Sequence, residues 1–194
     1  MGIVRKFKVS LCSRDEIRDF VETWHYSKSI NGVISDYCFK LQDEQDNLIG
    51  GMIYGRLAMA SCWKKYVSKE EDVSELRRLC CIDDTPRNTE SYFIGSTLRW
   101  LKKNTDILKI VSYADKNFGH EGIIYKASNF TKIGETSKGR VIIYNNKRYH
   151  DKCIRTKYNG KLKPFAEKIK SALDSGEAYY VKTLPKNIYI YNLR

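Results

Sequence analysis

The segment that most constrains the fold of this chain is 112-SYADKNFGHEGIIYKASNF-130. The apolar run before it predicts a buried strand, and Asp115 follows that strand in a polar turn. Gly119 and Gly122 interrupt the turn, and Tyr125 comes ten residues after Asp115 in a short helical pattern. This order predicts an α/β or α+β sheet with helices on both faces, and it places Asp115 at a strand end, where ligands gather in open sheets.

The rest of the chain supplies further strands and helices, with no internal repeat and no low-complexity linker. Ser13 and Glu16 match the S-x-x-E pattern of a helix capping box. Near the C-terminus we expect a helix that turns Phe165, Ile169 and Leu173 inward. In chain order the sequence predicts a helix at 13–24, strands at 37–41, 48–55 and 75–82, a helix at 88–101, a strand at 107–114, a helix at 121–129, a strand or hairpin at 132–145, a helix at 164–175, and strands at 178–181 and 188–191.

The strand 75-ELRRLCCI-82 carries two adjacent arginines within an apolar pattern. Strict alternation places one set of side chains on one face and the other set on the opposite face: Glu75, Arg77, Leu79 and Cys81 against Leu76, Arg78, Cys80 and Ile82. Glu75 and Arg77 would then be close enough for an ion pair, which is the structural alternative to a functional role for the arginine.

Positive charge is concentrated in the last third of the chain. The formal net charge is +12, and residues 131–194 hold 15 Lys and Arg but only 5 Asp and Glu. A basic segment of this kind favours a polyanionic partner, although a solvated basic surface is the alternative. Lysines and arginines there alternate with tyrosines that can stack on bases. The candidates for DNA contact are Lys147, Arg148, Tyr149, Lys152, Arg155, Lys157, Tyr158, Lys161 and Lys163.

Other features bear on the compartment. No run of 18 apolar residues predicts a membrane span, and the first residues lack the apolar core of a signal peptide. The six cysteines include no C-x-x-C pair, which favours free thiols over zinc or disulfides. We therefore expect a cytoplasmic protein without a membrane partner, and the sequence leaves a homodimer open.

The segment 86-PRNTES-91 predicts a helix N-terminus with free backbone N–H groups. Together with Arg87, Asn88 and Ser91, such a terminus can bind a phosphate or another anion. Simple helix capping is the competing interpretation.

Asp115 and Tyr125 form the most specific pair of candidate catalytic residues. A carboxylate at a strand end can accept a proton, and a tyrosine on the following helix can return one to a leaving group. Gly119 and Gly122 would let the turn pass close to a bound molecule. The alternative is that Asp115 only caps the next helix and Tyr125 belongs to the core.

The segment 125-YKASNF-130 resembles the Y-x-x-x-G-F signature of GNAT-fold acyltransferases, with Asn129 in the place of the usual glycine. The resemblance implies a mixed, mostly antiparallel sheet flanked by helices, acetyl-CoA or a related acyl or aminoacyl donor, and a tyrosine that protonates the departing thiolate. The pyrophosphate loop R/Q-x-x-G-x-G/A of that superfamily is absent, and 83-DDTPRNTES-91 stands in its place.

A narrower resemblance covers roughly residues 10 to 190. The motifs W-H-Y, E-L-R-R-L, P-R-N-T-E-S, S-Y-A-D, G-H-x-G and I-Y-K-A-S-N-F, followed by a basic tail, resemble phage Mom-type DNA-modification proteins. These GNAT-like enzymes convert adenine in double-stranded DNA to a carbamoylmethylated N6 form and so block host restriction. The resemblance therefore implies a phage or prophage transferase that acts in the bacterial host cytoplasm.

The same resemblance implies roles for individual residues. Asp115 and Tyr125 would be catalytic, and Arg77 would hold donor or substrate. It also implies that Ser91 contacts the donor. Further candidates for binding the donor are Arg87, Asn88 and Arg78. His25 and Tyr26 match a pair suspected of binding iron, although two adjacent ligands need His120 or Asp115 to complete a metal site. A surface histidine that stabilises the helix C-terminus is the alternative for His25.

We expect a catalytic core at 1–145 and a basic, tyrosine-rich extension at 146–194 that packs on it and contacts DNA. Chemistry on adenine N6 requires the base to leave the duplex, and Asp115 would then take the N6 proton. Two other functions stay open. One is a GNAT N-acyltransferase acting on another amine, and the other is a non-catalytic DNA-binding anti-restriction protein.

Overall fold

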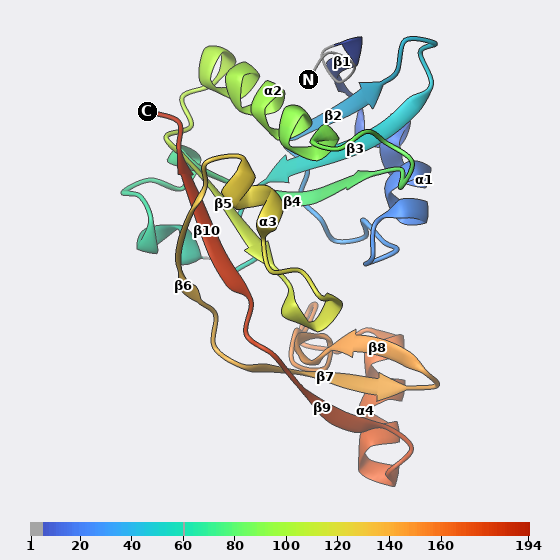
Figure 1. Cartoon of the computed structure of the whole chain (residues 1–194). Helices are drawn as coiled ribbons and strands as arrows, with labels where there is room; N and C mark the ends of the chain where they lie inside the picture. Colours follow the sequence, from blue (N-terminus) through green and yellow to red (C-terminus); the bar gives the residue numbers. More distant parts are fainter. Residues whose placement is uncertain (1–5, 60) are drawn as a thin grey trace. The chain divides into compact units, whose positions relative to one another are not determined.

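The computed structural model describes residues 6–59 and 61–194, and the chain forms two compact units (Figure 1). The core unit contains the chain up to Ala114 together with His120–Gly134 and Asn187–Arg194. The insert unit contains Asp115–Gly119 and Glu135–Lys186.

A seven-stranded sheet with the order β1-β2-β3-β4-β5-β10-β6 forms the core unit. The pairs β1–β2, β2–β3, β3–β4 and β5–β10 are antiparallel, and β4–β5 is parallel. This arrangement confirms the predicted mixed, mostly antiparallel sheet. The strands are β1 (Lys8–Cys12), β2 (Tyr37–Gln42), β3 (Leu48–Gly55), β4 (Val73–Cys81), β5 (Lys109–Ala114), β6 (Thr131–Glu135) and β10 (Asn187–Asn192).

Helices cover both faces of this sheet. Helix α1 (Arg14–Trp24) begins at the predicted capping box and packs around Ile53 of β3. Helices α2 (Thr89–Asn104) and α3 (Ile123–Ala127) pack in the cluster that contains Met52. Because Met52 and Ile53 are neighbours on one strand, their side chains point to opposite faces. The short helices η2 (Cys62–Lys65) and η3 (Glu70–Asp72) lie between β3 and β4 in the chain.

The predicted strict alternation along β4 is wrong because the strand contains a β-bulge. Pairing with β3 shifts between Arg78 and Leu76, which leaves Arg77 without a partner on β3. Leu76 and Leu79 therefore pack into the same hydrophobic cluster, although alternation predicted opposite faces. A bulge re-aims the side chain that it carries, and bulges are frequent beside active sites. Here it re-aims Arg77.

Strands β4 and β5 pair over only part of their lengths. The parallel ladder runs from Val73–Lys109 to Leu76–Ser112, and β4 then continues to Cys81 without pairing to β5. Beyond Leu76 the two strands have no ladder hydrogen bonds between them. The sheet therefore opens next to the bulge at Arg77.

The insert unit contains a three-stranded antiparallel sheet with the order β8-β7-β9. Its elements are β7 (Gly139–Tyr144), β8 (Lys147–His150), β9 (Tyr179–Thr183), α4 (Pro164–Ser175) and the short helices η4 (Lys116–Phe118) and η5 (Asp151–Ile154). Helix α4 buries Ala166, Ile169 and Ala172, whereas Phe165, which we expected inward, is 48% exposed.

The two units do not follow the expected division at residue 145. That boundary falls between β7 and β8, which pair as a hairpin. The last strand, β10, pairs with β5 and so belongs to the core sheet rather than to a C-terminal extension. Within the described part of the chain, no helix is both long enough and apolar enough to cross a membrane.

Candidate active site

The opening between β4 and β5 is bordered by a buried ion pair. Arg77 Nη1 donates to Glu75 Oε2 at 3.3 Å, and each side chain is only 11% exposed. The Glu75 carboxylate also accepts the Ala58 amide at 3.1 Å, and Arg77 donates to the Arg56 carbonyl at 3.1 Å. Arg77 Nε is buried without a hydrogen-bond partner. The guanidinium therefore keeps one unused donor.

Tyr125 on α3 lies in the aromatic cluster on the α2 face of the sheet. Its ring is 5.6 Å from that of Phe130 and 5.4 Å from that of Tyr189. Burial raises the pKa of Tyr125 to about 12, although a hydrogen bond with the Ser112 hydroxyl on β5 lowers it. The phenol is therefore protonated at neutral pH, as a proton donor must be.

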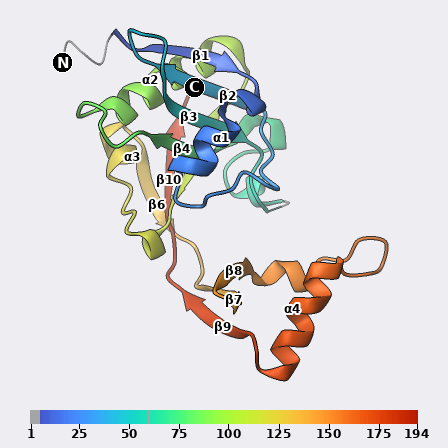
Figure 2. The same cartoon turned by 90° about the vertical axis from the view of Figure 1, so that its right-hand side faces the viewer.

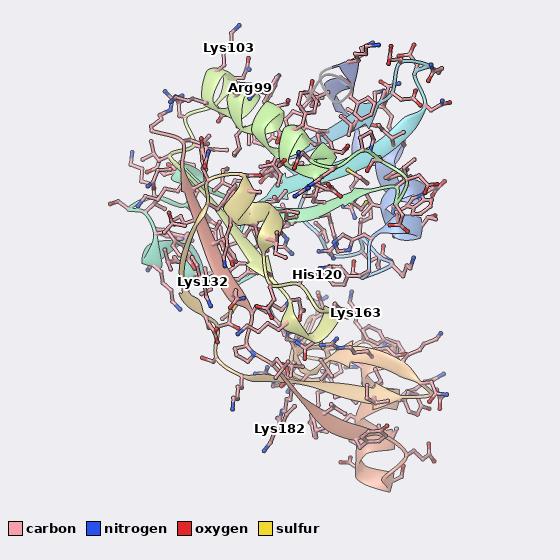
Figure 3. All side chains as sticks on the ribbon, viewed as in Figure 1. Arg99, Lys103, His120, Lys132, Lys163 and Lys182 are labelled. Atoms are coloured by element: carbon pink, nitrogen blue, oxygen red, sulfur yellow. The ribbon has the colours of Figure 1, made fainter. Side chains whose placement is uncertain are left out.

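Three rings of the core unit contact one another in tilted pairs. The centroid of Tyr26 lies 4.2 Å from that of His25 and 4.8 Å from that of His120. Burial, together with the positive charge of Arg78, lowers the pKa of His25 to about 3. Tyr26 also lies near enough to Tyr125 to act on its pKa. Figure 3 labels His120 on the chain that leads from β5 toward α3.

Tyr26 and Glu75 both raise the pKa of Tyr125 electrostatically, and each has its own partner, His120 and Arg77. We call these residues, with the Ser112 that bonds to Tyr125, the β4–β5 cluster: Tyr26, Glu75, Arg77, Ser112, His120 and Tyr125.

The expected iron site does not fit these residues. His25 Nδ1 is bonded to the Ser27 hydroxyl at 2.8 Å and accepts the Ser27 amide at 3.1 Å. In residues 6–59 and 61–194, no group of three or more His, Cys, Asp or Glu side chains could hold a metal ion. His120 does approach Tyr26, but through a tilted contact between the two rings.

Asp115 lies in the insert unit, and both of its carboxylate oxygens have partners there. Lys186 Nζ contacts its Oδ2 at 2.9 Å, and the Asn117 amide and side-chain nitrogen donate to Oδ1 at 3.1 and 2.7 Å. Burial alone would raise the pKa of Asp115, but the bonds from Asn117 and Lys186 lower it below its ordinary value. The carboxylate also caps η4, as the alternative interpretation predicted. Such a carboxylate is ionised but a weak base.

The two glycines of the turn have different surroundings. Both have a positive φ, +74° at Gly119 and +82° at Gly122. A Cβ at Gly122 would lie 2.3 Å from the Tyr189 ring, whereas a Cβ at Gly119 would meet nothing within 4 Å. Gly122 therefore permits a close approach to the protein's own core, and not to a ligand as we expected.

A pocket of about 240 Å³ lies between α2, α3 and the end of β10. Its lining includes Arg99 and Lys102, and Figure 3 shows Arg99 projecting from α2. The Ser128 hydroxyl, which also lines the pocket, is buried without a hydrogen-bond partner. Two cations and an unpaired hydroxyl suit a ligand that carries phosphate.

Of the four predicted donor-binding residues, Ser91 lines this pocket, and Arg78, Arg87 and Asn88 are not among its lining residues. Asn88 is the N-cap of α2 with φ +74° and makes no side-chain cap, and Arg87 is exposed beside it. Arg78 instead donates to the Ser29 carbonyl at 3.2 Å. Arg99, Lys102 and Ser128 were not predicted, because nothing in their local sequence marks them.

The predicted DNA-contact residues all lie in the insert unit. Their lysines and arginines are exposed, and Tyr158 is 56% exposed. Tyr149 is an exception, because its ring packs with Ile142 and Ile169 in the cluster beneath α4. We therefore do not assign Tyr149 a stacking role.

Comparisons with solved structures give acetyltransferases as neighbours. Spermidine/spermine N-acetyltransferase SpeG from Vibrio cholerae matches with a TM-score of 0.54 and 10% identity, over 99% of this chain and 95% of that one. A Bacillus subtilis acetyltransferase in complex with CoA matches with a TM-score of 0.55 and 12% identity, over 97% and 100%. At these identities the likeness shows the fold, which is that of the GNAT acetyltransferases.

A curated relative comes from a phage. The methylcarbamoylase Mom of Escherichia phage Mu is 30% identical over 120 residues, which are 60% of this chain and 49% of the phage Mu protein. The match thus spans about half the length of that relative. The sequence model of the Mom protein family matches residues 6–194. This chain therefore belongs to the Mom protein family.

Proposed function

We propose that this protein is a phage or prophage transferase that modifies the N6 amine of adenine in double-stranded DNA with a carbamoylmethyl-type group, and so protects the DNA from restriction. The observation that carries the proposal is a protonated, partly buried phenol, Tyr125, beside an opened β4–β5 pair in a chain of the Mom family. The phage Mu relative, named a methylcarbamoylase, supports the kind of group transferred.

An acyl-CoA is the donor class that the pocket supports. Arg99 and Lys102 would hold its phosphates, with Ser91 and the Ser128 hydroxyl as further donors. Bound there, the cofactor would supply an activated acyl carbon and a thiol leaving group, so the bond formed to N6 would be an amide; a glycyl amide is the isomer of a carbamoylmethyl adduct, in which the CH₂ carbon is bonded to N6. The α2 N-terminus lies about 16 Å along the helix from Arg99, so its backbone N–H groups would serve a second anionic group of the donor.

Within the β4–β5 cluster, Tyr125 donates a proton to the departing thiolate and, as the phenolate, takes the proton that N6 releases, while the Ser112 hydroxyl holds the phenol in place. Arg77 directs its unused Nε donor at developing negative charge, while Glu75 fixes the guanidinium. His120 and Tyr26 offer ring surface for the base.

Asp115 acts in this proposal as a positioning residue, because Asn117 and Lys186 occupy its oxygens. Asp115→Asn should then lower the modification rate by about 10-fold or less, with an unchanged pH profile. A loss above about 10³-fold together with an altered pH profile would instead make Asp115 the base that takes the N6 proton. Both readouts come from the same rate measurement at several pH values.

In this proposal the insert unit provides the electrostatic attraction to the DNA phosphates. It contains fourteen Lys and Arg against six Asp and Glu, a net charge of +8 in 57 residues. Phosphate contacts from such a unit release counterions, so affinity should fall steeply with salt.

Mass spectrometry of nucleosides from cells that express the protein tests the proposal. We expect a new adenine-derived nucleoside whose mass increment fits a carbamoylmethyl group. Cells that express Tyr125→Phe are the control and should lack it. An acetylated protein or small amine without altered adenine would favour an N-acyltransferase with another substrate. Restriction protection that vanishes when protein is stripped from unmodified DNA would favour protection by occupancy.

A further inference from the structure

A tight turn closes the segment that joins η5 to α4 in the insert unit. The Tyr158 amide donates to the Lys161 carbonyl at 2.7 Å, and the Lys161 amide donates to the Tyr158 carbonyl at 3.1 Å. The two residues between them have positive φ, 50° at Asn159 and 78° at Gly160. Asn-Gly with positive φ at both positions is the signature of a type I′ hairpin turn. The backbone here is therefore fixed by its own hydrogen bonds.

This turn displays an aromatic ring with a cation beside it. Tyr158 is 56% exposed, and the ammonium of Lys163 lies 4.3 Å from the centroid of its ring. We call residues 155–163 the tip. The tip carries Arg155, Lys157, Lys161 and Lys163 and no acidic residue. Figure 2 shows this segment projecting from the insert unit beyond the start of α4.

Other tyrosines of the insert unit are less suited to contact a base. Tyr180 also has a cation over its ring, the guanidinium of Arg140 at 4.1 Å, but it lies along β9 and not on a projecting turn. Tyr149 packs in the cluster beneath α4. Tyr179 is 59% exposed, but it lies along β9 and not on a projecting turn. Tyr158 alone of these four combines exposure, a rigid projecting backbone and an adjacent cation.

We propose that the tip is a stacking wedge for duplex DNA, in which its lysines and Arg155 bind phosphates and the Tyr158 ring stacks on a base at an opened step. The inference rests on the proposed function for its choice of partner. Stacking of one base on an aromatic side chain contributes roughly 5- to 100-fold in affinity and tolerates any sequence. Opening a step is unfavourable, and the phosphate contacts of the tip offset that cost.

Duplex oligonucleotides that each carry one 2-aminopurine test the wedge, because this base brightens when it leaves the stack. The set places the probe in several sequence contexts, and no donor is added. Wild-type protein and Tyr158→Phe should raise the fluorescence on binding. Tyr158→Ala should abolish the rise and weaken binding about 5-fold or more. Tyr179→Ala, the matched exposed tyrosine, should change neither.

The salt dependence of the affinity distinguishes the contribution of the Tyr158 ring from that of the lysine charges. Lys161→Ala should lower the slope of log affinity against log salt by about 0.9 while the fluorescence rise persists at saturation. Tyr158→Ala should leave that slope unchanged. Circular dichroism melting confirms that each variant folds.

No fluorescence rise with wild-type protein, or an equal rise with Tyr158→Ala, would overturn the wedge. The result is separable from the proposed function, since binding is measured without chemistry. A rise that depends on Tyr158, without modified adenine in cells, would keep the wedge and reject the transferase. Modified adenine in cells without a fluorescence rise would reject the wedge and keep the transferase.

Discussion

The two units differ in how they are stabilised. The core unit buries large clusters on both faces of its sheet and is close to charge balance, with a net charge of +4 in 137 residues. The insert unit has a net charge of +8 and one cluster of four buried residues. So small a core is marginal by itself, and the insert unit adds ion pairs from Arg140 at 3.2 Å and Arg155 at 3.0 Å to the buried Asp151.

This difference separates two tasks. A proton donor such as Tyr125 needs a dry, rigid surrounding, which the core clusters provide. Phosphate contacts need exposed cations, whose mutual repulsion a small unit tolerates at the surface. We infer that chemistry belongs to the core unit and DNA affinity to the insert unit.

The largest expected effect is on chemistry alone. Tyr125→Phe keeps the ring but removes the proton donor, so the modification rate should fall about 10²- to 10⁴-fold. DNA affinity, measured by fluorescence anisotropy, should stay within about twofold of wild type. An equal loss of affinity and rate would show that the residue serves binding as well.

Paired glycine substitutions compare the packing of the units. Gly122→Ala drives a Cβ into Tyr189 and adds backbone strain, so we expect a loss of about 3 kcal/mol in the free energy of unfolding. Gly119→Ala adds the strain but meets open space, for a loss of about 1 kcal/mol. Urea denaturation measures both, and equal losses would contradict the close approach at Gly122.

Acid should destabilise the core unit through His25. Its pKa is about 3 in the folded protein against an ordinary value of 6.5, so below pH 6.5 the unfolded chain takes up a proton that the folded chain refuses. Stability is therefore complete above pH 6.5 and falls as the pH drops toward 3, by on the order of 3 kcal/mol at pH 4. His25→Gln should flatten this dependence, and an unchanged slope would contradict the buried neutral imidazole.

The smallest expected effect is on affinity alone. Replacing Lys157, Lys161 and Lys163 by alanine should weaken DNA binding roughly 10- to 100-fold at moderate salt and lower the salt slope by about 2 to 3. The thermal midpoint should hold, because these side chains are exposed. Matched substitution of three exposed lysines in the core unit, Lys8, Lys69 and Lys103, should have a much smaller effect.

Local signals in the sequence predicted most of the elements. The capping box at Ser13 and the strand, turn and helix around Asp115 and Tyr125 each depend on neighbouring residues, so their positions can be inferred from sequence. The mixed sheet followed from the element order and the family resemblance.

The features that the sequence could not predict depend on contacts between residues far apart in the chain. The bulge at Arg77 depends on the register with β3, and the capture of Asp115 by Lys186 joins residues 71 positions apart. The return of β10 to the core sheet moved the unit boundary. The role of Tyr149 could have been inferred, because it alternates with charged residues on β8 and so can face a helix such as α4.

The central assignment is tested most directly by pairing two quantities for three proteins: modified adenine in the DNA of expressing cells, and the DNA affinity of the same purified proteins. Tyr125→Phe should bind DNA normally and leave no modified adenine. The triple lysine variant should bind weakly and recover modification at higher expression. A Tyr125→Phe protein that still modifies adenine, or that loses affinity as the triple variant does, would contradict the division of chemistry and binding between the two units.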